Sequence, residues 1–212
     1  MPYGAPTGLP RRGQTYYQGQ TPPTTFAESA HVEGTMVQFK DTTAAGAFGG
    51  DSLRSNNDIL MRLVRNTSGF TLLPSRLLQW QAGHIGKRVD GYVEDEWDPS
   101  VAGVYDEFHT SGVVDNDMGW LVVQGPTMLK TPLAGDETNV IDAFDALVAI
   151  TAATTNCTTA GRVQAFGVTT NYTDAATEAP AQIRGIIGRA LSAKTTAQTN
   201  QDLYAYIDLL RA

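Results

Sequence analysis

The sequence predicts a mainly β protein: a β-sandwich or β-barrel body with one or two short helices and an extended N-terminal arm. Short runs of β-branched and aromatic residues are separated by Gly, Asn, Asp and Pro about every ten residues, which is typical of sandwiches and barrels. The first thirty residues are instead dominated by Pro, Gly, Gln, Thr and Tyr. The chain has 212 residues, of which 42% are hydrophobic, so it can fill a core.

Ten segments of four to nine residues are predicted to be strands, because apolar residues alternate or cluster in them between turn residues. They are residues 35–41, 58–66, 69–74, 76–81, 89–93, 119–125, 127–131, 161–168, 183–191 and 202–210. Gly125 and Pro126 interrupt one apolar run, and they predict a tight turn between residues 119–125 and 127–131.

Two segments have a helical pattern. In residues 139–155, Ile141, Phe144, Leu147 and Val148 lie at helical spacing, which predicts a helix for the first part. The second part of this segment reads equally well as a buried strand. Residues 101–112 are a weaker helical candidate, because glycines lie close to both ends and β-branched residues lower the helix propensity.

The predicted organisation is an arm over residues 1–34 and a β-rich body over residues 35–212, with a candidate sub-domain break near residues 132–140. Alone, the arm has too little apolar surface to offset the entropy cost of ordering it. We therefore expect a neighbouring subunit to order it. The aromatic and arginine side chains that would anchor it to a partner are Arg11, Arg12, Tyr16, Tyr17 and Phe26.

The charge of the chain disfavours direct binding to nucleic acid. Its formal net charge is −7, whereas phosphate contacts require clustered Lys and Arg. The N-terminus lacks the pattern of a signal peptide, and no run approaches eighteen apolar residues. We therefore expect synthesis in a host cytoplasm and no membrane contact. The one cysteine, Cys157, excludes an intramolecular disulfide.

Motifs for metal, phosphate or nucleophile chemistry are incomplete. Gly86 and Lys87 lack the remaining residues of a phosphate loop, so a turn with solvated Lys87 and Arg88 is the simpler interpretation. Residues 115–119 have the opening spacing of a calcium loop, but Pro126 stands where the bidentate Glu is needed. His31, His84 and His109 lack metal-ligand spacing and are interpreted as turn or surface residues. No catalytic residue, metal or cofactor is predicted.

One acidic run leaves an enzymatic alternative open. Glu94, Asp95, Glu96 and Asp98 are close in sequence, and two of them facing one cleft could act as a catalytic carboxylate pair. Adjacent carboxylates in a loop that ends in proline more often form a solvated patch or a docking surface. A β-rich glycan hydrolase is therefore the least favoured interpretation.

The C-terminal two-thirds resembles the capsid decoration, or cement, proteins of tailed bacteriophages. The resemblance covers roughly residues 60–212 and lies in "GWLVVQGPTMLKTP" and in three later motifs. These are Gly161-Arg162-Val163, Gly188-Arg189-Ala190-Leu191 before a polar turn from Ser192 to Gln201, and a last strand with Leu203, Tyr204, Tyr206, Ile207, Leu209 and Leu210. The long arm, the greater length and the segment "NVIDAFDALVAIT" depart from the family pattern.

The resemblance implies a structural virion protein that binds the outer surface of the major capsid protein shell and stabilises it. It also implies self-association, with a homotrimer preferred over a dimer. Another virion component, such as a minor capsid, head-fibre or tail protein, is the alternative. Extended arms and apolar patches across subunit seams can perform this task without a catalytic pocket.

Overall fold

The computed structural model describes most of the predicted body but not the arm before Glu33. The described residues are 33–41, 57–93, 100–131, 140–149, 161–166, 185–194 and 202–209. They form ten strands, and these residues contain no helix. The strands are β1 (Met36–Lys40), β2 (Asp58–Asn66), β3 (Leu77–Trp80), β4 (Arg88–Tyr92), β5 (Val101–Tyr105), β6 (Met118–Lys130), β7 (Ala146–Ala149), β8 (Val163–Ala165), β9 (Gly188–Ala190) and β10 (Asp202–Asp208). The predicted mainly β fold is confirmed.

Five of the strands close into a ring. Hydrogen bonds link them in the order β2, β4, β3, β5, β6, and β6 pairs again with β2. Only the β2–β4 pairing in this ring is parallel. A closed ring is the arrangement of a small β-barrel, in which each ring strand is paired on both sides. Of the two predicted body types, the pairing therefore corresponds to the barrel.

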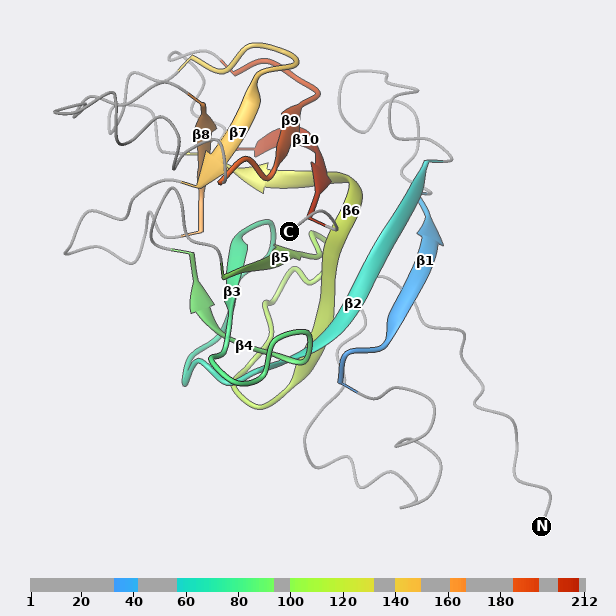
Figure 1. Cartoon of the computed structure of the whole chain (residues 1–212), viewed down its shortest axis with the longest axis vertical. Helices are drawn as coiled ribbons and strands as arrows, with labels where there is room; N and C mark the ends of the chain where they lie inside the picture. The colour runs from blue at the N-terminus through green and yellow to red at the C-terminus, as the bar shows by residue number, and fades with distance from the viewer. Residues whose placement is uncertain are drawn as a thin grey trace, which may run out of the picture.

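The remaining strands extend the sheet from the ring. β1 pairs with β2, whereas β10, β9, β7 and β8 follow β6 in that order. Figure 1 shows β7, β8, β9 and β10 grouped beyond one end of the ring, with β1 lying alongside β2. The three later motifs that resemble decoration proteins thus lie at and around β8, β9 and β10, whereas "GWLVVQGPTMLKTP" lies largely in β6.

The predicted turn at Gly125 and Pro126 is wrong, because β6 runs through both residues. Its first part pairs with β2 and β5, and its second part pairs with β10. The strand curves between these two sets of partners (Figure 1). Gly125 has a φ of 116°, and a Cβ there would lie 2.7 Å from the backbone oxygen of Asp58. Glycine therefore permits a curve and a close strand contact here, not a chain reversal.

Both helix predictions are also wrong. Residues 101–105 form β5, which is hydrogen-bonded between β3 and β6, and long-range pairing outweighs the weak local propensity. In the described part of the other segment, Phe144 lies in a turn with a φ of 75°, which is incompatible with a helix. The alternative strand interpretation holds for β7, which pairs with β8 and β9.

The core lies on both faces of the ring strands. Leu63 and Val64, which are adjacent in β2, belong to different hydrophobic clusters. The cluster that contains Leu63 also includes Trp120 and side chains from β7 to β10, so it joins the ring to the rest of the sheet. Phe39 of β1 packs edge-on against Trp120, with ring centroids 5.5 Å apart. Burial on both faces explains the nearly continuous apolar runs of β2 and β6.

One predicted strand is reduced to a single bridge. Residues 69–74 contribute only the antiparallel pairing of Leu72 with Val113, which brings two connecting segments together. Both residues are fully buried in the cluster that contains Val64. This segment therefore serves as a packed connection and not as a full strand. Within the residues described, no helix has the length and apolar character needed to cross a membrane.

Candidate functional site

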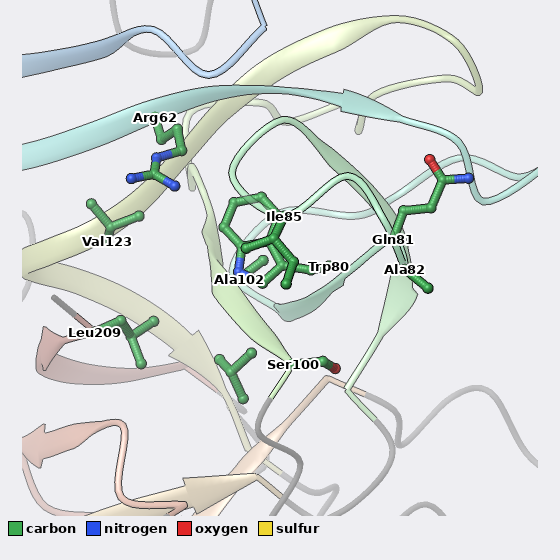
Figure 2. Close-up of a pocket in the computed structure, with 10 residues that line it drawn as sticks. Arg62, Trp80, Gln81, Ala82, Ile85, Ser100, Ala102, Val123 and Leu209 are labelled. Atoms are coloured by element: carbon green, nitrogen blue, oxygen red, sulfur yellow. The ribbon is translucent and has the colours of Figure 1, made fainter. Parts of the chain in front are cut away.

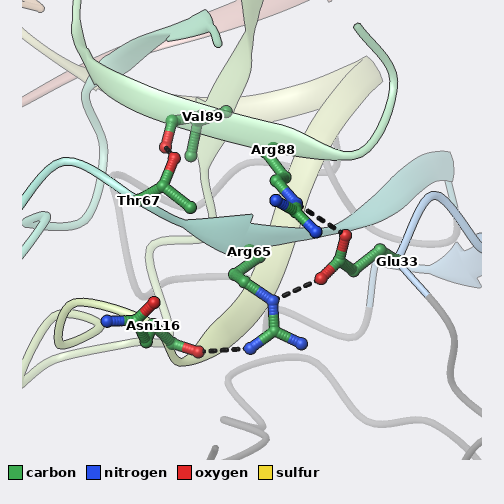
Figure 3. Close-up of polar contacts among 6 residues, drawn as sticks. All are labelled: Glu33, Arg65, Thr67, Arg88, Val89 and Asn116. Carbon is green, nitrogen blue, oxygen red and sulfur yellow. Dashed lines mark hydrogen bonds and ion pairs between the residues drawn. The ribbon is translucent and has the colours of Figure 1, made fainter. Parts of the chain in front are cut away.

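An ion-pair cluster fixes the chain where the predicted arm joins the body. Glu33 accepts hydrogen bonds from Nε of Arg65 in β2 and from Nε of Arg88 in β4, the latter at 3.0 Å. Arg65 also donates from Nη1 to the backbone oxygen of Asn116 at 2.6 Å. Figure 3 shows the two guanidinium groups converging on the Glu33 carboxylate. The backbone N–H of Gly34 donates to Leu63, so the attachment involves both side chains and main chain.

The two arginines keep the Glu33 carboxylate ionised. Partial burial acts to raise the pKa of Glu33, but the hydrogen bonds and charges of Arg65 and Arg88 outweigh it. The pKa of Glu33 therefore lies below its ordinary value. The cluster is a structural anchor for the segment that leads into β1. Glu33 is far from both arginines in the sequence, so no local motif reveals the cluster.

The predicted partner-binding residues Arg11, Arg12, Tyr16, Tyr17 and Phe26 lie outside the described residues. The same holds for His31, for Cys157, for the acidic residues Glu94, Asp95, Glu96 and Asp98, and for residues 132–139 of the candidate sub-domain break. The interpretation of the acidic run as catalytic or solvated therefore stays a prediction, as does the role of the arm.

The glycine-rich segment between β3 and β4 forms the predicted turn. Gly83 and Gly86 have φ angles of 78° and 83°, and His84 lies within this turn, as predicted. Lys87 is exposed as predicted, whereas Arg88 is solvated only in part, because its side chain is 37% exposed but its Nε pairs with Glu33. The ion pair comes from a residue 55 positions away, which local sequence cannot indicate.

The predicted turn before Trp120 is confirmed. Asn116 has a φ of 69°, and Asp115 accepts a hydrogen bond from the backbone N–H of Gly69 at 2.8 Å. The acidic side chains here therefore support the connections at one end of the ring. Among the described residues, no group of three or more His, Cys, Asp or Glu side chains is arranged to hold a metal ion.

His109 takes part in turns through backbone hydrogen bonds with Asp106 and Gly112, as predicted, but it is buried, so its interpretation as a surface residue is wrong. Only 3% of it is exposed, and its ring stacks on Tyr105 with centroids 5.3 Å apart. Burial lowers the pKa of His109, although the charge of Asp106 opposes this shift. Burial, followed by the charges of Asp117 and Asp106, raises the pKa of Tyr105. This cluster is closed to solvent, so we assign it to the core and not to a reactive site.

A cavity lies on the ring. It has a volume of about 500 Å³ and is lined by Arg62, Trp80, Gln81, Ala82, Ile85, Ser100, Val101, Ala102, Val123 and Leu209. Four ring strands contribute to it, namely β2, β3, β5 and β6. Figure 2 shows Arg62, Val123 and Leu209 on one side of Trp80, with Gln81 and Ala82 on the other. No local sequence motif indicates this site, because its residues are spread from Arg62 to Leu209.

Comparisons with known proteins give one structural likeness. No protein-family model and no curated protein matches the chain. The chain is similar to a solved structure described as the head fiber gp8.5 N base of bacteriophage phi29, with 14% sequence identity and a TM-score of 0.39. The match covers 71% of this chain and 95% of that chain. A TM-score of this size does not establish a shared fold.

Proposed function

We propose that this protein is a structural component of a bacteriophage virion, and specifically a decoration subunit on the outer surface of the capsid. The resemblance of its C-terminal motifs to decoration proteins carries the proposal. In support, Gly188, Arg189 and Ala190 lie on β9, which pairs antiparallel with β10 in the way that the resemblance implies. The partners would be the major capsid protein and further copies of this chain, without a catalytic step.

The surface near β9 and β10 has a composition that suits docking. Phe144 is 72% exposed, and its backbone N–H donates to Ala190, next to Arg189. Arg189 lies opposite Tyr206 in the β9–β10 register, and both are exposed. Aromatic and arginine side chains carry much of the binding energy in protein interfaces. The left-handed backbone of Phe144 is an unfavourable conformation for a bulky residue, which is a feature of functional sites.

The Glu33 cluster gives the predicted arm a fixed starting point. An extended segment gains affinity when it begins from a rigid body, because fewer degrees of freedom are lost on binding. Glu33 is held by two arginines on two ring strands, so residues before it would leave the body from a defined position. This supports a role for the arm in reaching a neighbouring subunit, with Arg11, Arg12, Tyr16, Tyr17 and Phe26 as its anchors.

Deletion of residues 1–26 tests the proposal, because it removes these anchors and leaves Glu33 in place. The truncated protein should keep the circular dichroism spectrum and melting temperature of the body, yet fail to co-sediment with capsids of the encoding phage. A matched control replaces residues 1–26 with a Gly-Ser segment of equal length. Undiminished capsid binding by the truncated protein contradicts the proposed role of the arm.

Copy number separates a decoration subunit from the alternative virion components. A decoration protein should label hundreds of sites over the whole shell in electron micrographs of antibody-labelled particles. A minor capsid, head-fibre or tail protein should label few or localised sites, and that result would replace the decoration assignment. Light scattering of the purified chain measures whether it is the trimer that we expect.

A further inference from the structure

We propose that the cavity beside Arg62 and Trp80 binds a carboxylate that is carried on an apolar or aromatic body. The inference rests on this cavity and not on the proposed virion role. At about 500 Å³ the cavity lies within the size range of sites for small organic ligands. A single cationic group stands among mostly apolar walls, and these two features define complementary parts of a ligand.

The walls favour an apolar body. Ile85, Val101 and Val123 line the cavity together with Ala82, Ala102 and Leu209. The indole of Trp80 adds a flat aromatic surface, and Figure 2 shows it near the centre of the group, beside Ile85 and Ala102. Ile85 is 75% exposed although it is a large aliphatic residue. Burial of these surfaces against an aromatic ring or a branched chain would remove apolar area from water.

Arg62 supplies the charged partner. Its guanidinium carbon lies 5.6 Å from the centroid of the Trp80 ring, a cation–π distance that holds the group beside the cavity. Among the described residues, its Nη2 donates to the sulfur of Met36, at 3.2 Å, and its Nε is buried with no acceptor in that part of the chain. By contrast, Arg65 and Arg88 both pair with Glu33. Within the part of the chain that the structure describes, Arg62 thus has unused donors and no carboxylate partner, in a chain of net charge −7.

The single charge selects a carboxylate over other polar ligands. A carboxylate can accept two parallel hydrogen bonds from one guanidinium and neutralises it one to one. A phosphate would bring further charge that the apolar walls cannot compensate. A neutral sugar would leave the guanidinium charge unbalanced. The geometry therefore favours a monoanionic carboxylate with an apolar substituent.

The test is a ligand-observed NMR titration of the full chain with phenylacetate and with its uncharged amide analogue, phenylacetamide. Phenylacetate should bind with a dissociation constant of about 1 to 10 mM, the range for so small a ligand. Phenylacetamide should bind at least about tenfold more weakly, because it forms no charge-assisted hydrogen bond. Absence of phenylacetate binding at 30 mM, roughly three times the weakest expected constant, overturns the proposal, as does equal binding of the two compounds.

Variants locate the effect. Arg62→Gln should weaken phenylacetate binding about tenfold or more and abolish the preference over phenylacetamide. Arg76→Gln is the matched control, since Arg76 lies 5.2 Å from the Tyr92 ring centroid but does not line the cavity. If Arg62→Gln does not fold, Arg62→Lys serves instead. It should weaken phenylacetate binding several-fold, because lysine lacks the planar guanidinium that can form two parallel hydrogen bonds to a carboxylate. Unchanged binding in the folded Arg62 variant, or an equal loss in Arg76→Gln, refutes the site.

Two sources of such a carboxylate are distinguished by a peptide. The capped dipeptide acetyl-Phe-Asp-amide presents a side-chain carboxylate beside an aromatic group, as a protein partner would, and acetyl-Phe-Asn-amide is its neutral control. Tighter binding of the Asp peptide than of phenylacetate supports a protein segment as the ligand, whereas the reverse supports a small molecule. If phenylacetate or the Asp peptide binds no more tightly than its own neutral control, the proposed recognition of a carboxylate is contradicted.

Discussion

Glu33→Gln tests whether the ion-pair cluster anchors the segment that leads into β1. The substitution keeps the size of the side chain but removes the charge that faces Arg65 and Arg88. The Glu33 and Arg65 side chains are only 16% and 22% exposed, so this pair is partly shielded from solvent. Arg88 is 37% exposed, and its contribution is discounted for screening. We expect a loss of about 1–2 kcal/mol, between the values for surface and buried pairs.

The stabilisation by Glu33 should decrease at low pH. The pKa of Glu33 is lower in the folded protein than its ordinary value of 4.5, so the unfolded chain takes up the proton first as the pH falls. The stabilisation by Glu33 is therefore complete above about pH 4.5 and is lost as the pH falls through the folded pKa. The difference between wild type and Glu33→Gln should narrow steadily below pH 4.5.

Urea unfolding followed by circular dichroism measures this difference at pH 7 and in steps down to pH 3. Thermal melts should show a decrease of about 2 to 8 °C at pH 7 for a chain of this size. Asp142→Asn is the control, because it removes one exposed negative charge for which no side-chain bond is found among the described residues. A loss below about 0.3 kcal/mol at pH 7, or one that persists unchanged at pH 3, would refute the reasoning.

Three further predictions concern the core. Leu63→Ala should lower the free energy of unfolding by about 2–5 kcal/mol in urea titrations, because Leu63 of β2 is fully buried in the hydrophobic cluster that contains Trp120. Gly119→Ala should lower the melting temperature, since a Cβ would overlap the Tyr105 hydroxyl. Tyr105→Phe should be neutral or stabilising, because that buried hydroxyl has no hydrogen-bond partner among the described residues. His109 has a lowered pKa, so wild-type stability should fall below pH 6.5 more steeply than that of His109→Gln in parallel pH-dependent melts.

The sequence predicts those strands best whose apolar pattern matches their final environment. β2 is predicted with its observed bounds, residues 58–66, because polar residues end the run at both sides. The helix predicted for residues 101–112 is wrong because β5 is stabilised by pairing with β3 and β6. Local helix propensity takes no account of these distant strands. Gly125 and Pro126 resemble a turn for the same reason, since the pairing with β2 and β10 overrides local turn chemistry.

The two sites are harder to predict than the strands, because each is assembled from distant positions. Arg62 and Trp80 come from different strands, β2 and β3, and no local motif links them. Glu33 has no partner nearby in the chain, and its two arginines are 32 and 55 residues away. The register of the ring brings Arg62 to Trp80 and Arg65 to Arg88, and the pairing of the β1 segment with β2 adds Glu33.

The closure of the ring also determines the order in which the protein can fold during synthesis. β2 ends at Asn66, but its partner β6 begins at Met118 and continues to Lys130. At typical translation rates, about 3 to 12 s separate the appearance of these two strands. During that interval β1 and β4 can already pair along one edge of β2, whereas the opposite edge of β2 waits for β6. The nascent chain therefore carries an unpaired edge of an apolar strand, which is open to pairing with other chains until β6 closes the ring.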